Sequence, residues 1–150
     1  MEIVSKEKGS TYNLIKRYIA DAVAIARYFE DSLPSKADLA FRDAEGGKAE
    51  IFVPEIVVGE FIYIAMKERL NKNKIEALAI IRELLDEMES SSYLKPIGMT
   101  ATSWNHFLDS PVPELHDRII HSTALYFQPM DSVAIITNDA SLKQVFKTVW

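Results

Sequence analysis

Apolar and polar residues alternate along the chain in blocks that predict strands and helices in turn. Four mostly apolar blocks have the length of strands, at residues 14–20, 51–53, 93–97 and 133–137. Pro96 places the third of these at a sheet edge, because proline lacks the N–H group that an inner strand needs. Each block is followed by a segment with helical spacing. This alternation predicts an α/β domain with a mainly parallel sheet.

The predicted helices are bounded by residues that begin or end helices. They cover residues 22–29, 36–45, 55–70, 74–89, 100–108 and 114–127. Pro54 suits the first turn of the third helix, where its missing N–H would be unpaired anyway. One apolar stripe predicts the core-facing side of the fourth helix: Ala77, Leu78, Ile81, Leu84, Leu85 and Met88. We expect one domain over residues 11–150 and, before it, a polar leader over residues 1–10 that can remain disordered.

Composition narrows the class of protein. At 150 residues a chain can bury about 70% of the surface that its unfolded form exposes, which allows a core without disulfides or metals. The absence of cysteine removes disulfides, thiolate zinc sites and cysteine nucleophiles, and it favours a cytoplasmic protein. No segment reads as a secretory signal or reaches the ~20 apolar residues of a membrane span. The formal charge of -5 argues against a broad basic face for nucleic acid, though not against a local site.

Glu60 differs from the ordinary surface acids in its surroundings. Its helical neighbours one turn away in both directions are apolar: Ile56, Val57, Tyr63 and Ile64. We therefore expect its carboxylate on an apolar face, where it needs a cation, hydrogen bonds or a proton. The structural alternative is a core ion pair with one of three basic residues: Lys16, Arg17 or Arg118.

Asp117 shows a weaker form of the same pattern in the last predicted helix. It shares a helix face with Ile120 and Ala124. Glu114, one turn earlier, is an equally possible inward-facing acid. We expect Asp117 at the site and Glu114 as a supporting residue.

Asp21 and Asp139 follow two of the predicted strands and precede helical segments. For each alone, an N-cap is the simpler interpretation. Taken together they indicate more, because parallel strands end at one edge of a sheet, where ligands bind at the point of reversed strand order. At that edge Asp21, Glu60, Asp117 and Asp139 can converge.

Several carboxylates in one pocket repel each other unless cations neutralise them. Ligands that are all oxygen select hard metals, Mg²⁺ or Mn²⁺. A pair of such ions activates water and stabilises the leaving oxygen in phosphodiester hydrolysis. If four of the 22 acids serve this purpose, the overall acidity no longer argues against a nucleic-acid substrate.

Four segments in order carry a family resemblance. They are residues 18–21, the stretch from Ile51 through Pro54 to Glu60, residues 115–120 and residues 135–139, which close on Thr-Asn-Asp. This arrangement resembles the PIN-domain nucleases, especially the compact VapC toxin type. The resemblance implies a three-layer α/β/α fold, Mg²⁺ or Mn²⁺ in an acidic pocket, and endonucleolytic cleavage of RNA. An antitoxin partner and a homodimer are further implications.

By motif match, the resemblance assigns the metal and catalytic roles to four residues: Asp21, Glu60, Asp117 and Asp139. Thr137 is a possible supporting residue. The chain departs from the family pattern at Ala22–Val23, where members often carry a small hydroxyl or Asn residue. This departure keeps open a second hypothesis, a PIN-like scaffold without catalysis that binds RNA or a protein partner.

The remaining candidates have structural interpretations first. His116 and His121 are five residues apart and point in different directions on a helix, so they do not share a metal. Four aromatic residues are expected in the core, with a dimer or antitoxin groove as the alternative: Trp104, Phe107, Tyr126 and Phe127. Lys143 and Lys147 are candidate phosphate contacts.

Overall fold

The computed structural model describes residues 15–67, 74–91, 93–129 and 132–150. These residues form five strands, in chain order β1 (Lys16–Ala20), β2 (Ala49–Pro54), β3 (Leu94–Ile97), β4 (Ser132–Ile136) and β5 (Thr148–Val149). They also form seven helices: α2 (Ala22–Phe29), α3 (Ser35–Glu45), α4 (Glu55–Met66), α5 (Lys74–Ser90), α6 (Ala101–Asp109), α7 (Leu115–Phe127) and α8 (Ala140–Val145). The predicted leader lies outside the described residues.

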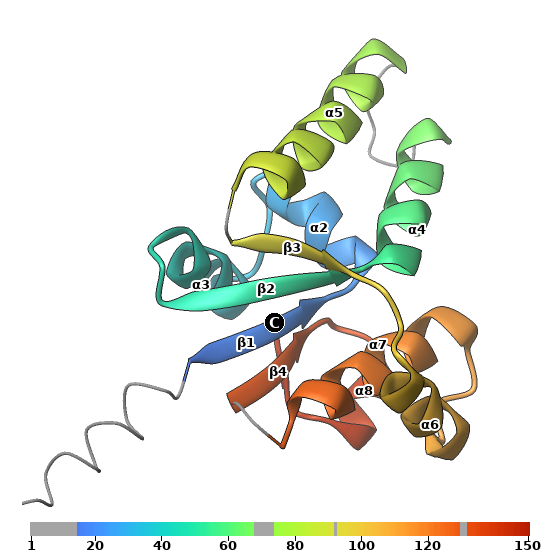
Figure 1. The fold of residues 1–150 in the computed structure, drawn as a ribbon. Coiled ribbons are helices and arrows are strands. Elements are labelled where there is room, and N and C mark those ends of the chain that lie inside the picture. Colours follow the sequence, from blue (N-terminus) through green and yellow to red (C-terminus); the bar gives the residue numbers. More distant parts are fainter. Residues whose placement is uncertain (1–14, 68–73, 92, 130–131) are drawn as a thin grey trace, which may run out of the picture.

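The five strands form one parallel sheet in the order β3-β2-β1-β4-β5 (Figure 1). The first described strand, β1, is central; the chain then builds outward through β2 to β3 and returns to the other side of β1 with β4. Strand order therefore reverses between β1 and β4. Pro96 lies in the edge strand β3, as the sequence predicts.

Helices cover both faces of the sheet. Arg17 and Tyr18 are successive residues of β1, so their side chains point to opposite faces. The Arg17 guanidinium lies 5.8 Å from the centre of the Phe127 ring in α7. Tyr18 lies on the side of α3, where burial and the charge of Asp43 raise the pKa of its phenol. The fold is thus the three-layer α/β/α sandwich expected from the sequence.

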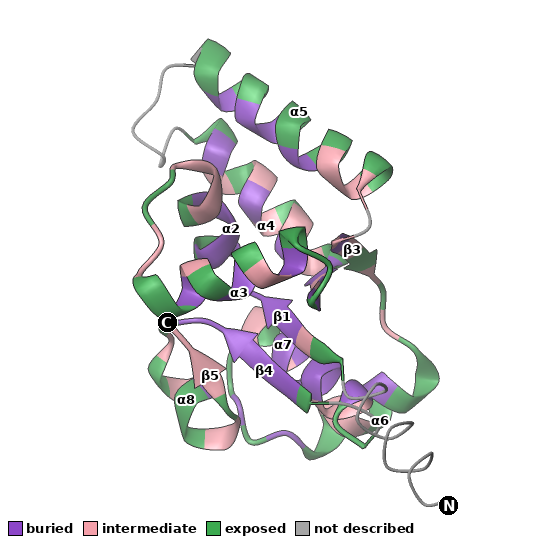
Figure 2. Cartoon of the chain, turned by 90° about the vertical axis from the view of Figure 1, so that its left-hand side faces the viewer, coloured by how far each residue is buried: buried purple, intermediate pink, exposed green. Residues whose placement is uncertain are grey.

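The inner strands are buried because they lie between two helical layers. Figure 2 shows β4 buried along nearly its whole length. Ile19, Ile51 and Ile135 are completely inaccessible to solvent. Strands buried on both faces have nearly continuous apolar sequences, which explains why these were recognisable from the pattern.

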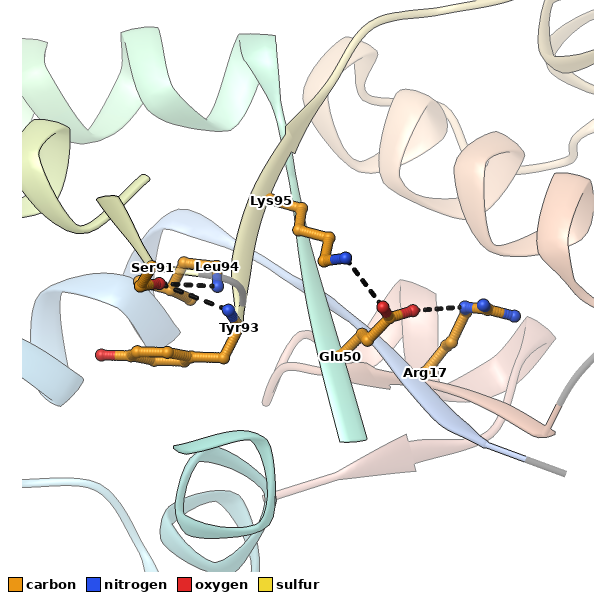
Figure 3. A network of polar contacts seen from close by, with 6 residues as sticks. All are labelled: Arg17, Glu50, Ser91, Tyr93, Leu94 and Lys95. Atoms are coloured by element: carbon orange, nitrogen blue, oxygen red, sulfur yellow. Dashed lines mark hydrogen bonds and ion pairs between the residues drawn. The ribbon is translucent and has the colours of Figure 1, made fainter. Parts of the chain in front are cut away.

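A polar contact fixes the three neighbouring strands β1, β2 and β3 near their amino ends (Figure 3). Glu50 accepts from Arg17 Nε at 2.9 Å and lies 2.8 Å from Lys95 Nζ. Partial burial opposes ionisation of Glu50, but the two cations outweigh it and lower the pKa. At the start of β3, the Ser91 hydroxyl accepts from the backbone of Tyr93 and Leu94.

The prediction of which residues of the fourth helix face the core was only partly correct. In α5, Ala77, Ile81 and Leu84 are buried as expected, but Ile80 is buried too, while Leu78 and Leu85 are each 42% exposed. Within the described residues, α5 packs mainly against α4 and β3, and Leu78 and Leu85 lie outside the face that these elements cover. The sequence pattern also does not predict β5, which has only two residues.

No helix within the described residues is both long and apolar enough to span a membrane.

The two adjacent leucines of α5 test this packing. Leu84→Ala removes a fully buried side chain, so we expect the free energy of unfolding to fall by about 2–5 kcal/mol. Leu85→Ala is the matched control, and its loss should stay below about 1 kcal/mol because the side chain is already partly solvated. Urea denaturation measures both. Equal losses would contradict the orientation of α5.

Candidate active site

An acidic cavity of about 440 Å³ opens at the carboxyl edge of the sheet. It lies where β1 and β4 end, at the point of reversed strand order, and α4 and the start of α7 complete it. Eight described residues line it: Asp21, Ala22, Val23, Glu60, Glu114, Asp117, Asn138 and Asp139. All four predicted acids and the predicted supporting residue Glu114 are therefore at one place. None of the described lining residues is basic.

Asp21 follows β1 directly and caps α2. Its Oδ1 accepts from the Ala24 backbone N–H at 2.8 Å, and its Oδ2 accepts from the Thr137 hydroxyl. Burial raises the pKa of Asp21 to about 6; these two donors oppose the shift, while Glu60 and Asp139 add to it. The N-cap interpretation is thus correct, and the same side chain also faces the cavity.

Asp139 follows β4 and caps α8 in a corresponding way. Its Oδ1 accepts from the backbone N–H groups of Ser141 at 2.9 Å and Leu142 at 3.3 Å, and from the Ser141 hydroxyl at 2.6 Å. These donors lower the pKa of Asp139, and the Ser141 hydroxyl has the largest effect. A carboxylate with this pKa remains ionised beside the more buried Asp21.

The Thr137 hydroxyl links the two strand-end acids. It donates to Asp21 and accepts from the Asp139 backbone N–H at 3.0 Å, and the residue is completely buried. One hydroxyl therefore fixes the orientation of one carboxylate and the backbone that carries the other.

Glu60 does not lie in the middle of the buried face, contrary to the sequence prediction. The buried row of α4 consists of Val57, Phe61 and Ala65, and Tyr63 is 57% exposed. Glu60 borders this row with its side chain 32% exposed, 3.7 Å from His116 Nδ1. The neighbouring apolar residues were therefore a poor guide to burial, because α4 is apolar on nearly all sides.

The three basic residues proposed as core partners do not account for Glu60. Lys16 and Arg17 lie near the amino end of β1, at the end of the sheet away from the cavity, and Arg17 pairs with Glu50. The Arg118 guanidinium donates to the carbonyls of Phe107 at 2.8 Å and Leu108 at 3.2 Å, at the end of α6. Among the described contacts, His116 is the basic group beside Glu60.

Glu114 and Asp117 both line the cavity at the start of α7, but they have different contacts. Glu114 is the N-cap, and its Oε1 accepts from the Asp117 backbone N–H at 3.0 Å. Asp117 is only partly exposed, and its pKa is raised to about 7 by burial and then by the charges of Asp139, Glu114 and Asp21. Proton uptake at such a pKa is the expected response of a carboxyl group held among other carboxylates.

His116 is a residue of the site that the sequence analysis did not select. Its Nδ1 lies 3.4 Å from Glu114 Oε2 and 3.7 Å from Glu60 Oε2, so it bridges α7 and α4. The signal was its position beside Asp117 in the first turn of a helix.

The other candidates occupy different places. His121 is buried with Nδ1 2.8 Å from the Ser110 hydroxyl, and it does not line the cavity. Lys143 Nζ donates to Asn138 Oδ1 at 2.5 Å, beside the cavity. Phe127 packs against Phe52 in the core, whereas Trp104 is 47% exposed, so the expectation of core burial was wrong for Trp104.

The donor set is chemically suited to a hard divalent cation, because five carboxylates provide only oxygen. Among the described residues, no group of three or more Asp, Glu or His side chains is arranged to hold a metal ion. Asp21, Asp139 and Glu114 each direct one oxygen to backbone donors, and the Asp117 and Asp139 side chains are hydrogen-bonded to each other.

The crowding of charge predicts that Asp117→Asn stabilises the metal-free protein. The raised pKa means that the folded state binds a proton more tightly than the unfolded state, so ionised Asp117 costs stability above pH 7. This cost disappears as the pH falls toward 4. We expect a higher melting temperature for the variant at pH 8 and a smaller difference at pH 5, measured in EDTA. Asp86→Asn, at an exposed position of α5, is the control, and a variant less stable than the parent at pH 8 would contradict the argument.

Comparisons with known proteins agree with this architecture. The VapBC2 crystal structure from Rickettsia felis, bound to a DNA fragment from their promoter, contains a chain that superposes with a TM-score of 0.63 at 16% sequence identity. The match covers 89% of this chain and 99% of that chain, and shows a common fold. No curated protein matches. The family model of the PIN domain matches residues 18–147. The chain therefore belongs to the PIN domain family.

Proposed function

We propose that the protein is a metal-dependent endoribonuclease that acts in the cytoplasm as the toxin of a toxin–antitoxin pair. PIN domains are generally nucleases that use divalent metal ions. The observation that carries the proposal is the cavity at the reversal of strand order, lined by Asp21, Glu60, Asp117 and Asp139. The proposed substrate is RNA.

Mg²⁺ or Mn²⁺ would be held by Asp21, Glu60, Asp117 and Asp139, which line one cavity. When bound, the metal supplies a Lewis acid that activates water and stabilises the leaving oxygen. Thr137 orients Asp21, while the Ser141 donors keep Asp139 ionised. Glu114 accepts a hydrogen bond from the Asp117 backbone N–H and so fixes the position of Asp117; we do not assign Glu114 a role as a metal ligand.

An antitoxin and a second copy of the chain are the proposed protein partners. The VapBC2 structure supports the first, since it contains a fold of this kind together with its antitoxin. Val23 and Leu115 are about half exposed at and beside the cavity, where a bound segment would cover them. Tyr63 and Met66 leave an exposed apolar surface on α4 that suits a homodimer.

The alternative of a non-catalytic scaffold has one specific support. Ala22 and Val23 line the cavity and bring no polar group to Asp21 at the position where family members often have a hydroxyl or amide. In a non-catalytic scaffold, the acidic cavity would serve only to bind RNA or a protein partner. Cleavage experiments separate the two functions.

The first experiment measures cleavage of a labelled single-stranded RNA with Mg²⁺, with Mn²⁺ and with EDTA. We expect cleavage with either metal and a loss of about 100-fold or more in Asp21→Asn and Asp139→Asn, because each removes a proposed ligand. Asp86→Asn is the control for charge alone. Circular dichroism must show that all variants are folded. Cleavage in EDTA, or none in folded parent protein, would refute the enzyme and favour the scaffold.

A second pair of variants decides which helical acids matter. Glu60→Gln should reduce the rate by about 10-fold or more, whereas Glu114→Gln should have a smaller effect, because its amide oxygen still accepts from Asp117. Titration of the melting temperature with Mn²⁺ gives the metal affinity of each variant. If Glu60→Gln changes neither rate nor affinity while Glu114→Gln abolishes both, the assignment is wrong.

A further inference from the structure

A second cavity of about 300 Å³ lies beside the acidic one. Its walls come from the start of α4, the connection from β3 to α6, and helices α6 and α7. Figure 1 shows this connection leaving β3 near the start of α4 and running to α6. Ile56, Ile97 and Ile119 make the walls largely apolar. A cavity of this volume and character is suited to a small planar ligand group.

Trp104 supplies an aromatic surface to this cavity. Its side chain is 47% exposed, yet its ring packs edge-on against Phe107 with centroids 5.2 Å apart. The Arg118 guanidinium lies 4.8 Å from the Phe107 ring centre and donates to the Phe107 carbonyl. The indole is therefore supported in one orientation without being buried, as an aromatic stacking platform requires.

Glu55 supplies the one charged side chain among the described residues of the lining. No hydrogen-bond donor or ion-pair partner within the described ranges accounts for its carboxylate. Gly98 lies directly beside it: a Cβ at that position would be 3.4 Å from Glu55 Oε1. The missing side chain leaves the carboxylate room beside the apolar walls.

We propose that this cavity is a nucleobase subsite that selects guanine in the RNA substrate; the inference rests on the proposed function. A carboxylate is only an acceptor, with two oxygens side by side. Guanine is the RNA base whose Watson–Crick edge presents two adjacent N–H donors to such a pair. Adenine, cytosine and uracil each direct an acceptor at the carboxylate. Stacking on Trp104 adds affinity for any base, so Glu55 provides the discrimination.

The subsite lies within reach of the acidic cavity through two helices. Ile56 lines the subsite and Glu60 the acidic cavity, one turn apart on α4, about 6 Å along the axis. On α7, Ile119 lines the subsite and Asp117 lines the acidic cavity, two residues apart, or about 3 Å along the axis. A guanosine bound in the subsite thus places a neighbouring phosphate toward the carboxylates.

Nucleotide binding in EDTA tests the subsite independently of cleavage. Trp150→Phe leaves Trp104 as the single tryptophan, and its fluorescence is followed during titration with GMP, AMP, CMP and UMP. We expect saturable quenching by GMP, with half-saturation at about tenfold lower concentration than for the other three. Glu55→Gln in the same background should bring GMP to within about threefold of AMP. Glu83→Gln, at an exposed position of α5, is the matched control and should leave the preference intact.

Several outcomes would overturn the proposal. Quenching that is linear in concentration, equal for all four nucleotides, or unaffected by Glu55→Gln would each do so. If guanine preference is absent while the parent protein cleaves RNA, the subsite falls and the proposed function stands. If GMP binds through Glu55 but no RNA is cleaved, the base site stands and the nuclease proposal falls.

Discussion

The parallel pairing of β1 with β4 is the constraint on which the acidic cavity depends. Ala20 lies opposite Ile136 in this pairing, so the next residues, Asp21 and Thr137, meet just beyond the sheet. The Asp21 backbone N–H continues the ladder to the Ile136 carbonyl at 3.3 Å. β2 and β3 extend from the other side of β1, and the acidic cavity opens at the junction of β1 and β4. The same topology therefore brings the two acids together and leaves room for a ligand.

The electrostatic cost of the site is distributed unevenly among its carboxylates. Asp139 has several donors and a lowered pKa, whereas Asp21 and Asp117 have fewer compensating contacts and raised values of about 6 and 7. Without a cation, taking up a proton relieves the repulsion between the carboxylates. With a bound cation, all of the carboxylates can be ionised, and their attraction to the cation contributes to its binding free energy. The site is thus less stable than an ordinary surface cluster for the same reason that it is suited to a metal.

The sequence was informative where packing leaves little choice. Buried parallel strands are apolar throughout, and Asp21 and Asp139 were recognisable because each ends such a strand. It was less informative about the rotation of helices. Glu60 has apolar neighbours, but so does almost every residue of α4, and the elements packed against α4, among them α2, α5 and β2, determine which of them is buried.

Sequence spacing is also a poor guide to the burial of Leu85 and to contacts between residues far apart in the chain. Leu85 fits an apolar stripe, yet it is 42% exposed because the elements packed against α5 cover a narrower face than the stripe. His116 lies between acids from two helices, and the proximity of Glu60, 56 positions away, is a tertiary fact that spacing along α7 does not contain. Short elements such as β5 are specified by pairing with β4 rather than by their own sequence.

The helices α4 and α7 line both cavities, so the proposed base site and the acidic site would be coupled through them. Each helix contributes a carboxylate to the acidic cavity and an isoleucine to the apolar one. His116 holds the helices together near Glu60, and Arg118 links α7 to the end of α6, which carries Trp104 nearby. A shift of α7 would move Asp117, Ile119 and the support of Trp104 together. Rigid packing of this one helix would therefore maintain the spacing between the proposed base site and the carboxylates.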